Sequence, residues 1–294
     1  MTSPGLDHTE DLVRSFDGTF ITARRMGEDK GAELPLLVAN AIGANLAIWR
    51  GALADVVTER TVVTWDHRGF YGSGAPASDR SDAAAHAEDA LAVADHFDID
   101  RFAVASWSNG ALIALELARS YPGSVSALAL VCGGYGHPLE RLVRHFELAS
   151  LLPVAAGVGR RLSPLLQVGF RLLASRPELP GIIRQSGMVA AGADTVALAD
   201  LVRGMAESDL GYLLRSYEKL MAGGNAGLVD GISVPTLLVA AERDQFTSQA
   251  MMREMAEAIP GARLEVYEDA THYLPIERPA RLSQDLRGFL ASLD

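Results

Sequence analysis

The sequence has little cysteine, less positive than negative charge, and no long uninterrupted apolar run. Cys132 is the only cysteine among the 294 residues, so no disulfide forms within the chain and nothing indicates an oxidising compartment. Lysine and arginine number 26 against 37 aspartates and glutamates, which gives a formal net charge of −11. Because an acidic surface repels phosphate backbones and anionic membranes, the composition argues against a nucleic-acid partner.

The apolar runs are short, since glycine, proline or a charged residue interrupts each one before it could span a bilayer. Residues 1–30 contain no basic segment followed by an apolar run, which a secretory signal would require. We therefore expect a cytoplasmic protein without stable membrane insertion. A small-molecule substrate is the expected partner, and the sequence leaves open whether the chain forms a homo-oligomer.

Short apolar runs alternate with segments of helical spacing along most of the chain. Six runs have strand length: Leu36–Ala39, Thr61–Trp65, Phe102–Ala105, Ala127–Val131, Thr236–Ala240 and Arg263–Tyr267. Helical spacing occurs at Ser81–Phe97, Asn109–Tyr121, Met251–Ile259 and Ala280–Leu293. Because strands this apolar suit burial on both faces, the alternation predicts a mostly parallel, doubly wound α/β sheet. We expect Leu12–Arg25, broken at Asp17-Gly18, to form an antiparallel hairpin at one edge.

The alternation stops at Gly136 and resumes at Val234-Pro235. From Gly136 to Asp230 the pattern is helical, and prolines divide it into short pieces. We therefore predict a core domain of residues 1–135 and 231–294, with a helical cap of residues 136–230 inserted after the sixth core strand. The cap is more apolar than a solvated face requires. Either it only packs on the core, or it is also a lid that binds the non-reacting part of an apolar substrate.

One serine lies where a predicted strand passes directly into a helix. The strand residues FAVA run into Ser106-Trp107-Ser108-Asn109-Gly110, and the helix follows at once. A small-x-Ser-x-Gly pattern in this setting is typical of a nucleophile elbow, a tight turn whose neighbours must be small and whose serine backbone is strained. The turn lifts the hydroxyl to where a base can reach it, so we predict that Ser108 is a nucleophile. The structural alternative is a helix N-cap.

A neutral serine needs a histidine that accepts its proton, and the histidine needs a carboxylate that fixes its tautomer. Of the seven histidines, His272 follows a late core strand in a loop downstream of the serine. His67 also follows a core strand and is the main competitor. His86 and His96 fall on a predicted amphipathic helix, where we expect them at the surface. We therefore predict that His272 is the base.

The predicted acid is Asp244, which follows the strand Thr236–Ala240 at the end of the sheet where α/β active sites gather. Its neighbour Glu242 is interpreted as a solvated loop charge. Asp269 precedes His272 by three residues and is too near in sequence to orient it easily.

With these motifs the chain resembles the capped α/β-hydrolases over nearly its whole length, from LLVANAIGAN to the final helix. Ser108, Asp244 and His272 occur in the order that the family uses. WDHRGFYGSG resembles the family's Asp-x-Arg-Gly-x-Gly-x-Ser loop with one residue inserted, and DATHYLPIERP resembles its histidine loop.

The resemblance also implies an oxyanion hole, with the backbone N–H groups of Ile42 and Asn109 as its donors. Asn40-Ala41-Ile42 stands where the family has His-Gly-x. A serine at the elbow argues against dehalogenase and epoxide-hydrolase chemistry, which needs a carboxylate there. The resemblance therefore favours hydrolysis of a carboxylic ester, lactones and thioesters included.

Two other functions stay open at this point. Relatives with similar triads cleave carbon–carbon bonds of diketones or act as perhydrolases and cofactor-free haloperoxidases, and the fold also serves as a ligand receptor with little turnover. No metal or organic cofactor is expected. Gly69, Gly72 and Gly74 form a turn-rich stretch that lacks the strand–helix placement of a nucleotide-binding loop.

Overall fold

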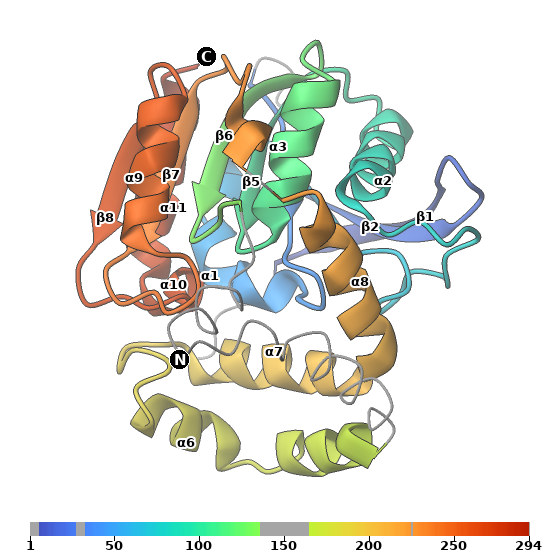
Figure 1. Cartoon of the computed structure of the whole chain (residues 1–294), viewed down its shortest axis with the longest axis vertical. Coiled ribbons are helices and arrows are strands. Elements are labelled where there is room, and N and C mark those ends of the chain that lie inside the picture. The colour runs from blue at the N-terminus through green and yellow to red at the C-terminus, as the bar shows by residue number, and fades with distance from the viewer. Residues whose placement is uncertain (1–5, 28–32, 136–164, 225, 294) are drawn as a thin grey trace.

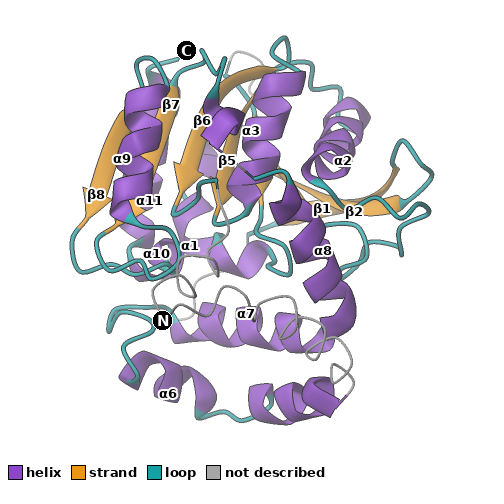
Figure 2. Cartoon of the chain, viewed as in Figure 1, coloured by secondary structure: helices purple, strands orange, loops and turns teal. Residues whose placement is uncertain are grey.

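The computed structural model describes residues 6–27, 33–135, 165–224 and 226–293. In this part of the chain, one sheet has the strand order β1-β2-β4-β3-β5-β6-β7-β8 (Figures 1 and 2). Its strands are β1 (His8–Arg14), β2 (Phe20–Met26), β3 (Leu36–Ala39), β4 (Val62–Trp65), β5 (Phe102–Trp107), β6 (Val125–Val131), β7 (Thr236–Ala241) and β8 (Arg263–Tyr267). The β1–β2 hairpin and the β2–β4 pair are antiparallel, and the other neighbours are parallel. This confirms the predicted α/β sheet with its edge hairpin.

Helices cover both faces of the sheet, because successive residues of a strand point to opposite sides. The helices are η1 (Leu46–Ile48), α1 (Arg50–Leu53), η2 (Val56–Thr58), α2 (Ala83–His96), α3 (Gly110–Ser120), α6 (Leu179–Gln185), α7 (Thr195–Glu207), α8 (Leu210–Ala222), η4 (Ala226–Val229), α9 (Gln249–Ala258), α10 (Leu274–Glu277) and α11 (Pro279–Ala291). In β3, Leu37 and Ala39 join the core beneath α2, α3 and α9, whereas Leu36 and Val38 join the core beneath α1 and α11. Among the described helices, none combines the length and the apolarity needed to cross a membrane.

The helices between β6 and β7 lie at the carboxyl ends of the parallel strands. Figure 1 shows α6 and α7 below the strand tips, and α8 rising from their level toward α3. A helical stretch at 165–174 precedes α6, so the described part of the predicted insert is largely helical, as expected. Residues 136–164 of that insert lie outside the described residues.

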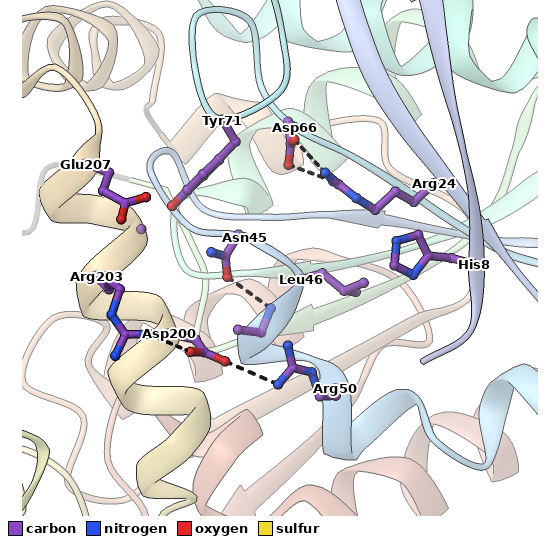
Figure 3. Close-up of a pocket in the computed structure, with 12 residues that line it drawn as sticks. His8, Arg24, Asn45, Leu46, Arg50, Asp66, Tyr71, Asp200, Arg203 and Glu207 are labelled. Carbon is purple, nitrogen blue, oxygen red and sulfur yellow. Dashed lines mark hydrogen bonds and ion pairs between the residues drawn. The ribbon is translucent and has the colours of Figure 1, made fainter. Parts of the chain in front are cut away.

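A cavity of about 370 Å³ is lined by residues of α7, of η1 and of the β1–β2 hairpin (Figure 3). The arginines that line it are each paired with a carboxylate. Arg24 pairs with Asp66 over 2.8 Å, while Arg50 and Arg203 pair with Asp200 over 3.3 and 3.2 Å. Because Arg50 belongs to α1 and Asp200 to α7, the pair of Arg50 with Asp200 joins α7 to α1.

Gly204 lets α7 approach the core closely at this cavity. A Cβ atom on Gly204 would lie 2.8 Å from both Asn45 Nδ2 and Tyr71 Cε1. Both side chains are held in place, since Asn45 Oδ1 accepts a hydrogen bond from the Ala47 N–H and the Tyr71 hydroxyl donates to the Gly43 carbonyl. A side chain at position 204 would therefore push α7 outward.

We expect Gly204→Ala to lower the free energy of unfolding by about 1–2 kcal/mol, because overpacking outweighs the gain of roughly 1 kcal/mol that alanine brings to a helix. Gly181→Ala in α6 is the matched control, since a Cβ atom there would meet nothing within 4 Å. That control should leave the free energy unchanged or raise it. Urea denaturation of both variants tests this, and equal effects at the two positions would contradict the close approach of α7.

Candidate active site

Ser108 lies in a tight turn between β5 and α3. Its φ angle of +57° is in the left-handed region that residues other than glycine seldom adopt. A Cβ atom on Gly110 would lie 2.5 Å from the Ala39 carbonyl oxygen, and one on Gly133 would lie 2.5 Å from the Ser108 carbonyl oxygen. Ser106, two residues before the turn, is fully buried. The turn thus has the crowded geometry that its small neighbours predict, at the carboxyl end of β5.

Ser108, His272 and Asp244 form one chain of hydrogen bonds. His272 Nε2 lies 2.8 Å from Ser108 Oγ, and His272 Nδ1 lies 2.9 Å from Asp244 Oδ2. The backbone N–H groups of Phe246 and Thr247 donate to Asp244 Oδ1 over 2.7 and 2.8 Å and hold the carboxylate in place. Because an ionised carboxylate only accepts, it selects the Nδ1–H tautomer of His272 and leaves Nε2 able to accept the serine proton.

The two other acids considered from the sequence, Asp269 and Glu242, have other partners. The Asp269 side chain is 78% exposed and lies 4.0 Å from Arg243. Glu242 accepts a hydrogen bond from the backbone N–H of Asp269 over 2.9 Å. His272 is thus oriented by Asp244, which is distant in sequence, and not by its near neighbour Asp269.

His67 and His86 form a buried pair behind the loop that follows β3. His67 is the other candidate for the base. Its Nε2 atom lies 2.8 Å from the carbonyl oxygen of Asn40, in the loop after β3. The two imidazole rings lie 4.8 Å apart, and burial lowers the pKa of both. The expected surface position of His86 is wrong, because α2 packs on α3 and β1 and turns this side of the helix inward. His96, at the end of α2, is exposed as expected.

Two residues that the sequence analysis did not single out hold the histidine loop. Trp107 Nε1 donates to the backbone carbonyl of His272 over 2.8 Å, and the ring centroids of the two residues lie 5.2 Å apart. The buried Glu277 carboxylate accepts from the backbone N–H groups of Thr271 and Ala190 over 2.7 and 2.8 Å. Both residues fall within the motifs quoted from the sequence. The local sequence does not indicate that Trp107 contacts His272 or that Glu277 contacts Ala190.

The two predicted oxyanion donors both line the cavity that contains Ser108. The Ile42 N–H donates to the side-chain amide oxygen of Asn109 over 2.8 Å. The Asn109 side-chain amide therefore occupies one of the two predicted oxyanion donors. Asn40 is buried, and its Nδ2 donates to Thr64 Oγ1 over 3.2 Å, which anchors the start of the loop to β4.

An apolar cavity of about 320 Å³ opens at Ser108. Helix α7 contributes Leu201 and Met205 to its wall, and α8 contributes Leu213 and Leu214. None of the described residues that line this cavity is an aspartate, glutamate, lysine or arginine. In the same described part of the chain, no group of three or more histidines, cysteines, aspartates or glutamates is arranged to hold a metal ion.

Curated relatives match nearly the whole chain. A protein of Azorhizobium caulinodans, provisionally named carbamate hydrolase RutD, is 27% identical over 271 residues and covers 91% of this chain and 95% of its own. Its namesake from Rhizobium rhizogenes is 22% identical over 265 residues, with coverage of 90% and 95%.

Solved structures share the fold. The enol-lactonase from Burkholderia xenovorans LB400 superimposes with a TM-score of 0.75 at 24% identity and covers 96% of this chain and all of its own. A thermophilic esterase from Thermogutta terrifontis does so with a TM-score of 0.69 at 22% identity, covering 98% and 99%. The family model for the alpha/beta hydrolase fold matches residues 35–279. The chain belongs to the alpha/beta hydrolase fold family.

Proposed function

We propose that this protein is a serine hydrolase that cleaves a carboxylic ester, lactones and thioesters included, of a fairly apolar small molecule. The observation that carries the proposal is the hydrogen-bonded chain from Ser108 through His272 to Asp244, which ends at an apolar cavity. A nucleophile within reach of a base, with a third group orienting that base, is the arrangement that covalent catalysis needs.

In the proposed reaction, Ser108 Oγ attacks the ester carbonyl carbon while His272 Nε2 takes the hydroxyl proton. Asp244 stabilises the imidazolium that results. The ester bond then breaks, His272 returns its proton to the leaving oxygen, and an acyl group remains on Ser108. A water molecule, activated by the same histidine, attacks the acyl-enzyme and releases the acid.

The oxyanion of each tetrahedral intermediate would lie against the backbone N–H groups of Ile42 and Asn109. Removing one such preorganised donor costs about 3–4 kcal/mol in a serine protease. Because the Ile42 N–H already donates to the Asn109 side chain over 2.8 Å, the substrate oxygen has to displace that amide. We therefore infer that the Asn109 side chain turns away when substrate binds.

We also propose that residues 136–230 act as a cap over this site. The support comes from the described part of this segment, because Leu201, Met205, Leu213 and Leu214 line the cavity at Ser108. Clefts between a core and an inserted segment are common places for apolar ligands.

Carbamate hydrolysis is a second candidate function. The RutD relatives, at 27% and 22% identity, carry the provisional name of carbamate hydrolases. Attack on a carbamate carbonyl needs the same nucleophile, base and oxyanion donors as attack on an ester carbonyl. A panel of p-nitrophenyl esters and carbamates with matched acyl size decides between the two substrates, and absence of turnover on both would favour a receptor.

We expect Ser108→Ala to abolish ester hydrolysis and labelling by a fluorophosphonate probe. The substitution removes one hydroxyl at a cavity surface, so the free energy of unfolding should change by no more than about 1 kcal/mol. In the wild type, the probe should label the peptide that contains Ser108. Activity above a tenth of wild type in the folded variant would rule out Ser108 as the nucleophile.

We expect Asp244→Asn to lower kcat by about 10³- to 10⁴-fold, because an amide no longer selects the productive histidine tautomer. Asp269→Asn is the matched control at an exposed carboxylate three residues before His272, and it should change kcat by less than about two-fold. Steady-state kinetics with one p-nitrophenyl ester compare the two. A larger loss at Asp269 would mean that the acid is assigned to the wrong strand end.

We expect Trp107→Phe to lower kcat by about 5- to 10-fold with little change in KM, because the lost indole N–H costs about 1 kcal/mol of positioning of His272. Trp49→Phe is the control, since Trp49 Nε1 is buried without a hydrogen-bond partner among the described residues. That control changes core packing alone. If both variants reduce kcat equally, the effect belongs to packing and the positioning role fails.

A further inference from the structure

Two cavities of very different size meet at Ser108. The larger, of about 320 Å³, is the apolar cavity already described. The smaller, of about 30 Å³, is also lined by Gly134, Met221 and Met251, which do not line the larger one. Ser108, Asn109, Tyr217 and Phe246 line both of them. An ester bound at Ser108 therefore has two unequal spaces for its two halves.

The hydrogen-bonding groups decide which half enters which space. When Ser108 Oγ attacks, the carbonyl carbon carries three further substituents: the oxyanion, the leaving oxygen and the acyl chain. The oxyanion must face the N–H groups of Ile42 and Asn109, and the leaving oxygen must reach His272 Nε2 to receive its proton. Ile42 and His272 both line the large cavity, and neither is among the described residues that line the small one. The leaving alcohol thus extends into the large cavity, and the acyl chain is directed to the small one.

The small cavity holds little more than an acetyl group. One water molecule needs about 10–15 Å³ of such volume, so about 30 Å³ accommodates two or three heavy atoms. Its far wall includes Met221 from α8 and Met251 from α9, both at least nine-tenths buried. A longer acyl chain would have to displace these two side chains.

The large cavity suits a bulky, uncharged alcohol. Its walls from α7 and α8 are aliphatic, and Phe246 adds an aromatic surface. The two tyrosines in the lining stay neutral, because burial raises the pKa of Tyr217 to about 12 and also raises the pKa of Tyr273. Transfer of a charged alcohol from water into this cavity would be unfavourable, because none of the described lining residues is an aspartate, glutamate, lysine or arginine that could pair with the charge.

We propose that the preferred substrate of this site is an ester of an acetyl-sized acyl group with a bulky, uncharged alcohol. The inference rests on the proposed function of Ser108, Asp244 and His272. It also assigns the two parts of the substrate: α7 and the residues Leu213 and Leu214 of α8 line the site of the alcohol, whereas Met221 of α8 limits the length of the acyl group.

Two substrate series test the proposal on the wild-type protein. In the first, the alcohol is 1-naphthol and the acyl group grows from acetate to butyrate and hexanoate; kcat/KM should fall at least ten-fold. In the second, the acyl group is acetate and the aliphatic alcohol grows from ethanol to butanol and cyclohexylmethanol. Each methylene should raise kcat/KM by up to about four-fold while the cavity excludes water.

Variants at the small cavity provide the matched test. Met221→Ala and Met251→Ala, made separately, should each raise the ratio of hexanoate to acetate turnover at least ten-fold. Leu213→Ala enlarges the other cavity and should leave that ratio unchanged. Thermal denaturation identifies which methionine variant folds, and one folded variant suffices for the comparison.

The outcomes separate the inference from the proposed function. Turnover of hexanoate equal to or above that of acetate in the wild type would overturn the inference while leaving Ser108 as the nucleophile. The inference would also be overturned if the ratio of hexanoate to acetate turnover rose in Leu213→Ala and stayed unchanged in the methionine variants. Absence of both ester turnover and fluorophosphonate labelling would instead defeat the proposed function.

Discussion

The strained turn at Ser108 is the constraint on which the rest of the site depends. A serine at φ +57° is tolerated only because the chain on either side is held firmly, by the buried strand β5 before it and by α3 after it. The contacts that a Cβ atom would make at Gly110 and Gly133 show how closely the neighbouring loops approach this turn. That close approach brings the loop after β3 and the end of β6 beside the hydroxyl of Ser108.

The histidine loop is held from two directions, and this connects parts of the chain that are far apart in sequence. From the elbow, the Trp107 indole donates to the backbone of His272. From the end of α10, the Glu277 carboxylate accepts hydrogen bonds from the backbone N–H of Thr271, in the histidine loop, and of Ala190, in the segment between β6 and β7. Through Glu277, the segment between β6 and β7 is therefore joined by hydrogen bonds to the residue that precedes His272.

Helix α7 separates two environments of opposite character. Leu201 and Met205 line the apolar cavity at Ser108, whereas Asp200 and Arg203 line the charged cavity of Figure 3. Pairing of the charges with one another keeps them out of the apolar space, where an unpaired charge would be costly. The helix is thus anchored to α1 on one side and presents an aliphatic wall to the cavity at Ser108 on the other.

The sequence by itself determined the sheet, its edge hairpin and the positions of Ser108, Asp244 and His272 at strand ends, because burial, periodicity and turn chemistry are local properties. It failed for His86, whose helix looks amphipathic in isolation yet buries this histidine beside His67. Only the tertiary structure decided the contact of Trp107 with His272, the Asn109 amide on the Ile42 donor and the two unequal cavities. Each of these joins groups from distant segments, and the spacing of residues along one segment carries no information about such contacts.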